Sequence, residues 1–254
     1  MNRPSMILIR RAVTGVIRRP SATITGFAMS MFFLVIYNAG LGGIGFLPQF
    51  SNGGYLAFIL PFCVISLGIG SSGGAGQSIL RDMSSGYFHR LRLSPAPGWA
   101  FIAAPIAADA FALTITSSLF LGAGILFGVP LAHGIISFAG IVLMSVLWGI
   151  TISALSAALI IRSGNPQASQ GIIMIFFSAM FLSTSFLPYE LITSVWLKKV
   201  LWFNPVTYPL EGMRQLICGS FRGYFVYAGI AVTSAMALLA ILFASCTARK
   251  AFEY

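Results

Sequence analysis

Few residues of this chain could carry out chemistry, and they are scattered. Its 254 residues include five Asp or Glu, two His and three Cys, without the repeated spacing of a metal site or a disulfide framework. The two histidines, His89 and His133, fall on opposite sides of the membrane in the topology that the apolar runs and the positions of Lys and Arg predict. None of the three lysines follows a glycine-rich G-x-x-x-x-G-K-[ST] loop, so there is no P-loop for ATP. We therefore predict no enzymatic centre, metal or cofactor in this chain.

One carboxylate differs from the others because it lies within a long apolar run. Asp109 is the only charged residue between Trp99 and Ile161. Ionisable residues inside membrane helices are rare and often functional. Asp109 could attract a cationic substrate or carry a proton, which makes it a candidate for the substrate path. Alternatively, it faces the helix bundle and is held by hydroxyls such as those of Thr114 or Thr116, or by another helix.

The elements that position these residues are predicted to be membrane helices. Hydrophobic residues make up 57% of the chain and charged residues 8%, whereas a soluble domain carries about a quarter charged residues. Lipid must therefore surround most of the chain, and we predict an all-α integral membrane protein. The net charge of +10 does not indicate nucleic acid, because the basic residues form short clusters at the ends of apolar runs, where lipid headgroups would meet them.

Charge-poor runs separated by Gly, Pro and Asn turns predict six transmembrane helices, because one crossing needs about 20 residues. The predicted spans are 22–41, 55–76, 101–128, 135–161, 171–187 and 224–246. Before them, residues 4–19 place their arginines on one face and apolar side chains on the other. This pattern predicts an amphipathic helix that lies in the membrane interface.

The second predicted span is unusual in its residue types. It contains Pro61 and then a run of small residues, Ser66 to Gly76. Small residues let membrane helices approach closely, and successive glycines also weaken a helix. The run therefore predicts tight packing or, alternatively, a bending segment near the transport path.

The distribution of Lys and Arg predicts the orientation, because these residues favour cytoplasmic loops. If the N-terminus is inside, eleven of them lie in the cytoplasm and four outside. The inner set is Arg3, Arg10, Arg11, Arg18, Arg19, Arg81, Arg90, Arg92, Arg162, Arg249 and Lys250, and the outer set is Lys198, Lys199, Arg214 and Arg222. We expect a multi-pass protein of the plasma or inner membrane with both termini in the cytoplasm.

The first cytoplasmic loop, residues 80–97, offers more than a connector needs. Aromatic and leucine side chains stand beside arginines here, as in protein-binding patches. The stretch Ser85–Pro95 resembles the cytoplasmic loop of ABC-2-type permeases, the six-helix membrane subunits of ATP-binding-cassette exporters of the daunorubicin-resistance type. The resemblance implies a coupling helix that seats in a groove of the ATPase. Its contacts would be Phe88, Arg90, Leu91 and Arg92.

A second stretch, Leu201–Arg214, resembles the outer segment of the same family. The resemblance implies that residues 188–222 form short re-entrant helices that gate the exit. The matching residues are Asn204, Pro205, Tyr208, Glu211 and Arg214. Asn204-Pro205 also suits a helix start, and Glu211 and Arg214, three residues apart, can pair on one helix face. The alternative is a small solvated extracellular cap.

Together these resemblances imply one ABC-2-type transmembrane domain over residues 1–254. The chain would be the permease subunit of an ATP-driven exporter that moves a hydrophobic or amphiphilic substrate, such as a drug or lipid, outward by alternating access. Separate ATPase subunits would bind ATP and Mg²⁺, and a second copy or a homologous permease would complete the membrane dimer. The alternative is a self-sufficient secondary transporter or channel, although no internal repeat is visible.

Overall fold

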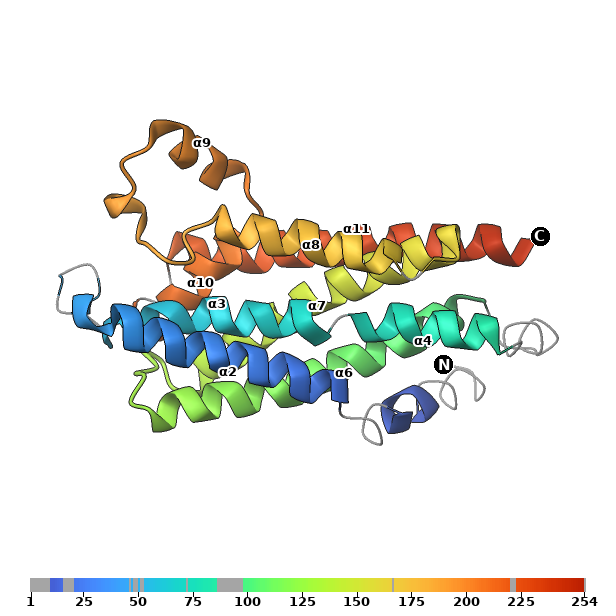
Figure 1. Ribbon diagram of the computed structural model, residues 1–254, viewed down its shortest axis with the longest axis horizontal. Helices are drawn as coiled ribbons and strands as arrows, with labels where there is room; N and C mark the ends of the chain where they lie inside the picture. The colour runs from blue at the N-terminus through green and yellow to red at the C-terminus, as the bar shows by residue number, and fades with distance from the viewer. Residues whose placement is uncertain are drawn as a thin grey trace.

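The computed structural model describes residues 10–15, 21–45, 47, 50, 53–71, 73–85, 98–165, 167–219 and 223–253, which form helices and turns without a strand. Most of the long helices lie side by side along one direction (Figure 1). Their order is α2 (Ser21–Leu41), η1 (Gly42–Ile44), α3 (Gly54–Ser71), α4 (Gly73–Ser84), α6 (Gly98–Leu126), α7 (Ile135–Ser163), α8 (Gln167–Phe181), η3 (Tyr189–Leu191), α9 (Val195–Phe203), α10 (Thr207–Cys218) and α11 (Tyr224–Glu253).

Five helical stretches within these described ranges are long and apolar enough to cross a membrane. They are Thr23–Ile44, Gly54–Ser84, Phe101–Leu126, Ile135–Ser163 and Tyr224–Arg249. The all-α fold is therefore confirmed, and five of the six predicted spans coincide with helices that are long and apolar enough to cross a membrane.

The predicted span 171–187 is the exception. Its helix, α8, covers Gln167–Phe181, and 15 residues extend only about 22 Å, less than the hydrocarbon core of a bilayer. The helix ends early because hydroxyls that follow it bond to one of its last carbonyls: Ser183 and Ser185 both donate to the carbonyl of Met180. These polar residues were wrongly counted as part of a continuous apolar span.

The small residues of the second span pack tightly, as one of the two interpretations predicted. A Cβ added to Gly70 would lie 3.1 Å from the Cα of Gly26, so α3 and α2 approach backbone to backbone. The described residues of this span lie in α3, up to Ser71, and in α4, from Gly73. α4 then continues to Ser84, beyond the predicted end at residue 76.

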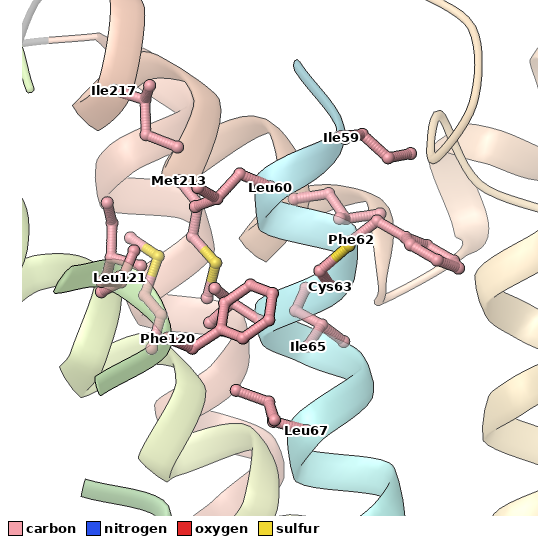
Figure 2. Packing of buried hydrophobic residues seen from close by; sticks show 14 of the residues in the cluster. Ile59, Leu60, Phe62, Cys63, Ile65, Leu67, Phe120, Leu121, Met213 and Ile217 are labelled. Carbon is pink, nitrogen blue, oxygen red and sulfur yellow. The ribbon is translucent and has the colours of Figure 1, made fainter. Parts of the chain in front are cut away.

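The core lies around α3 and α7. Figure 2 shows buried side chains of α3 meeting those of α6 and α10. α7 packs against α11, α6, α4, α3, α8 and α10, and its Trp148 is fully buried, edge-on to Phe176 of α8. These contacts make α7 the central helix of the bundle.

The two ends of the bundle carry different elements. α9 and α10 lie at one end, which we call the α10 end, and the last turns of α4 and α11 lie at the other, the α4 end (Figure 1). Residues 10–15, the described part of the predicted interfacial helix, are helical and lie at the α4 end, where Arg11 contacts Asp82 at 3.4 Å. Both described extremities of the chain therefore share one end.

Candidate functional site

The predicted outer segment forms short helices at the α10 end, and Asn204 fastens them to the bundle. Its side-chain amide donates hydrogen bonds to the carbonyls of Ala179 and Leu182, at 2.6 and 2.8 Å, where α8 ends. Its Oδ1 accepts the backbone N–H of Val206 at 3.0 Å. One side chain thus joins the end of α8 to the turn before α10.

The predicted helix start at Asn204-Pro205 is displaced. α10 begins at Thr207, and Pro205 lies in the turn between α9 and α10. The oxygen of Asn204 that could have capped the helix is used within this turn instead. Tyr208, in the first turn of α10, donates its hydroxyl to the carbonyl of Trp202 at 2.8 Å and so ties α10 to α9.

Arg214 is the most connected side chain of this end. Its Nη1 lies 2.6 Å from Oε1 of Glu211, which confirms the predicted pair, and 3.1 Å from Oγ1 of Thr184. Nη2 donates to the carbonyls of Thr184 and Ser185, and Nε donates to the carbonyl of Phe58 at 3.2 Å. All five N–H groups of the guanidinium are therefore used inside the protein.

This arrangement keeps a buried charge satisfied. The Arg214 side chain is 9% exposed, and the guanidinium carbon lies 3.6 Å from the centre of the Phe58 ring, a cation–π contact. Burial lowers the pKa of Arg214 below its ordinary value, and the carboxylate of Glu211 opposes that shift. Arg214 consequently joins α3, α10 and the turn after α8.

A cavity of about 410 Å³ lies beside this cluster. Aromatic rings form much of its wall, from Phe50, Phe58, Tyr189, Trp202, Tyr208 and Phe225. The polar groups at the wall come from Thr184, Glu190, Thr207, Glu211, Arg214 and Cys218. Such a volume and an apolar wall with few polar groups are typical of small-molecule sites.

Two polar groups of the wall are notable. Thr207 is 7% exposed, and its buried Oγ1 has no hydrogen-bond partner in the described part of the chain. Burial raises the pKa of the Cys218 thiol to about 11, with Arg214 opposing the shift, so the thiol is protonated at neutral pH. Thr207 therefore has hydrogen-bonding capacity that no described residue uses.

Asp109 lies elsewhere, at the junction of three helices. Its Oδ2 accepts the backbone N–H of Ala75 at 2.9 Å and the hydroxyl of Ser153 at 2.7 Å. Ala75 is the third residue of α4, and the first N–H groups of a helix have no partner within it. The carboxylate of α6 therefore caps α4, in keeping with the positive end of the helix dipole.

The alternative that another helix holds Asp109 is thus the one observed, and the hydroxyls of Thr114 and Thr116 are not its partners. Both donate to backbone carbonyls of their own helix, those of Ala110 and Ala112. In a membrane helix, such a bond within one turn satisfies a hydroxyl without a second helix.

The predicted ATPase contacts Phe88, Arg90, Leu91 and Arg92 lie outside the described residues. The helices that flank them are described: α4 ends at Ser84 and α6 begins at Gly98, both at the α4 end (Figure 1). Within the described ranges, no group of three or more His, Cys, Asp or Glu could hold a metal ion.

Sequence reasoning missed several partners at both places. Thr184, Thr207 and Glu190 were not singled out, although Ser183-Thr184-Ser185 at the end of an apolar run could have indicated a helix end. Ser153 gave no signal, because serines are frequent in the fourth span.

Comparison with known proteins identifies the family. Residues 5–218 match the family described as ABC-2 type transporter. The chain is 24% identical over 240 residues to the probable doxorubicin resistance ABC transporter permease protein DrrC of Mycobacterium tuberculosis, covering 92% of this chain and 86% of that protein. It is 25% identical over 195 residues to the daunorubicin resistance ABC transporter permease protein DrrB1 of Streptomyces coeruleorubidus, covering 76% and 67%.

A putative transport permease, ycf38, of Cyanophora paradoxa is 26% identical over 217 residues, covering 83% of this chain and 72% of that protein. The family match spans most of the chain and includes both stretches on which the resemblance was noticed. This chain therefore belongs to the ABC-2 type transporter family, as a multi-pass membrane permease subunit of an ABC transporter that is not itself an ATPase.

Proposed function

We propose that this permease is one half of an ATP-driven exporter that moves a hydrophobic or amphiphilic substrate, such as a drug or lipid, out of the cytoplasm or inner leaflet. The observation that carries the proposal is the family match over residues 5–218, together with relatives named for resistance to doxorubicin and daunorubicin. A cavity with an aromatic wall at the α10 end supports a substrate of this class.

The proposed topology has six crossings, with both termini in the cytoplasm. α8 would be the sixth crossing despite its length, because it runs from the end of α7 back towards the α10 end, where α10 and α11 begin (Figure 1). The orientation is supported by the arginines at the α4 end, among them Arg81 and Arg162. The α10 end would then face outward.

The ATPase would bind at the α4 end through Phe88, Arg90, Leu91 and Arg92 of the coupling loop 80–97. Its movements would reach the membrane helices through α4 and α6, which flank this loop. Residues 10–15 lie beside the same end, because Arg11 contacts Asp82. Two permeases and two ATPase subunits would form the exporter, and ATP-driven closure of the ATPase pair would rock the helices between inward-open and outward-open arrangements.

At the outer end, residues 188–222 would gate the exit. In this proposal Asn204, Pro205 and Tyr208 fix the turn and the relative placement of α9 and α10. Glu211 and Arg214 fix α10 to α3. For Asp109, the bonds to Ala75 and Ser153 favour a positioning role over direct substrate contact.

Co-purification with a candidate ATPase tests this function. The permease is expressed with ATPase subunits encoded in the same genome, and retention of each is measured in detergent. We expect the unmodified permease to retain one ATPase. Retention should be lost with Arg92→Glu, be weakened with Phe88→Ala and be unchanged with Arg162→Glu. Arg162 is the matched control because it is an exposed arginine in the last turn of α7.

Transport into inverted vesicles completes the test. We expect ATP-dependent uptake of an amphiphilic drug by the complex and none in Arg92→Glu. Transport by the permease alone, driven by an ion gradient and indifferent to Arg92→Glu, would instead establish the secondary transporter.

A further inference from the structure

We propose that the cavity at the α10 end is a binding site selective for a hydrophobic organic cation. Aromatic rings would hold the body of the ligand, and the carboxylates of Glu190 and Glu211 would attract its charge. The inference deepens the proposed export function, on which it rests for its biological meaning, by naming the charge of the substrate. The binding itself does not depend on transport.

The wall of the cavity suits the body of such a ligand. Six of its residues are aromatic, and the faces of Trp and Tyr rings attract cations as well as apolar groups. One ring already contacts a cation within the protein, because Nζ of Lys198 lies 5.1 Å from the centre of the Tyr189 ring.

Arg214 gives the cavity little attraction for an anion, although it is the only cation among the described residues that line the wall. Each of its five N–H groups already donates to an oxygen of the protein. A bound carboxylate or phosphate would have to displace one of these bonds and would leave an acceptor of the protein unmet. Arg214 therefore contributes a charge that Glu211 largely balances, and no hydrogen-bond donor.

The two carboxylates keep capacity for a ligand. Oε1 of Glu211 accepts both Arg214 and Thr184, whereas no donor among the described residues reaches its Oε2. Glu190 is exposed on η3, and no described side chain pairs with it. Among the described residues of the wall, two carboxylates against one guanidinium leave one net negative charge. The ammonium of Lys198, which lies over the Tyr189 ring, opposes this negative charge.

A pair of ions with the same shape and opposite charge tests the proposal directly. Binding of tetraphenylphosphonium and of tetraphenylborate to the purified full chain in neutral detergent is measured by equilibrium dialysis, without ATPase. We expect the cation to bind at least about tenfold more tightly than the anion, since opposite charges attract across a half-buried site. Equal binding, or tighter binding of the anion, would overturn the proposal even in a working exporter.

Substitutions then locate the site. Glu190→Gln should weaken binding of the cation about threefold to fivefold, the range of one partly solvated charge pair. Lys198→Gln should strengthen it, because a competing positive charge is removed. Trp202→Ala should weaken it, whereas Trp196→Ala should not. Both tryptophans are exposed on α9, at 56% and 63%, but Trp202 alone of the two lines the cavity.

Cation binding that is the same in Glu190→Gln, Trp202→Ala and Trp196→Ala would place the ligand elsewhere and refute the site. Thermal unfolding of each variant checks that the fold is kept, and the comparison of the two ions on the unmodified chain decides the question if Trp202→Ala unfolds. Failure of ATPase co-purification would refute the export function while leaving a measured cation preference intact.

Discussion

Replacement of Arg214 by Ala should destabilise the α10 end more than any other single substitution there. The change removes the guanidinium donors to the carbonyls of Phe58, Thr184 and Ser185 and leaves Glu211 without its cation. Each buried acceptor left unmet costs about 1–3 kcal/mol, and these costs do not simply add. Because the Glu211 side chain is 23% exposed, water offsets part of the loss.

We expect a net loss of about 3–5 kcal/mol, the usual range when one partner of a buried ion pair is removed. For a chain of this size, that lowers the apparent Tm by about 10 °C. The Tm of Arg214→Lys should lie between those of the unmodified chain and Arg214→Ala, since an ammonium keeps the charge but cannot reach all these oxygens with its three donors.

Thermal unfolding of the detergent-solubilised permease at one fixed scan rate measures the effect. Arg162→Ala is the matched control, because this exposed arginine has no comparable network among the described residues and should change stability by no more than about 0.5 kcal/mol. If Arg214→Ala melts within 2–3 °C of the unmodified chain, by the same order-of-magnitude scaling, the Arg214 network does not hold the α10 end together.

Three further predictions follow from close contacts and burial. Gly74→Ala should cost about 1–3 kcal/mol, because a Cβ there would lie 2.8 Å from Oδ1 of Asp109, whereas Gly122→Ala, with nothing within 4 Å, should cost nothing; thermal unfolding compares them. Asn204→Asp should unfold at a lower temperature than Asn204→Ala at neutral pH. In Asn204→Asp a charged carboxylate oxygen would face the two carbonyls that now accept hydrogen bonds from the Asn204 amide. Alkylation of Cys218, followed by mass spectrometry of its peptide, should accelerate about tenfold per pH unit from pH 7 to 10, because burial raises its pKa to about 11; a plateau near pH 9 would contradict this.

The long spans were predictable because a bilayer imposes one simple requirement, a run of about 20 apolar residues, that local sequence records directly. Four predicted spans agree closely with α2, α6, α7 and α11. The Glu211–Arg214 pair was predictable for a similar reason, since both partners lie on one helix, three residues apart.

The features that were not predicted from the sequence depend on contacts between segments far apart in the chain. The early end of α8 is fixed partly by Asn204, more than twenty residues later, and Phe58, the partner of Arg214 on α3, is 156 positions away. The acceptors of Arg214 on α3 and after α8 are mostly backbone carbonyls, which every residue possesses, so no residue type marks them. The same is true of Asp109, whose partner on α4 is a backbone N–H.

The cap that Asp109 places on α4 also sets an order of events during biosynthesis. The start of α4 leaves the ribosome 34 residues before Asp109 and still earlier than Ser153. Until α6 arrives, the first N–H groups of α4 have no protein partner from that helix, and in lipid an unmet N–H is costly. The cap on α4 can therefore form only after Asp109 of α6 has been made, and the bond that Ser153 adds to it only after α7. A variant such as Asp109→Leu should consequently show its largest defect in the yield of inserted, protease-resistant protein made in a cell-free membrane system, more than in the stability of molecules that have already folded.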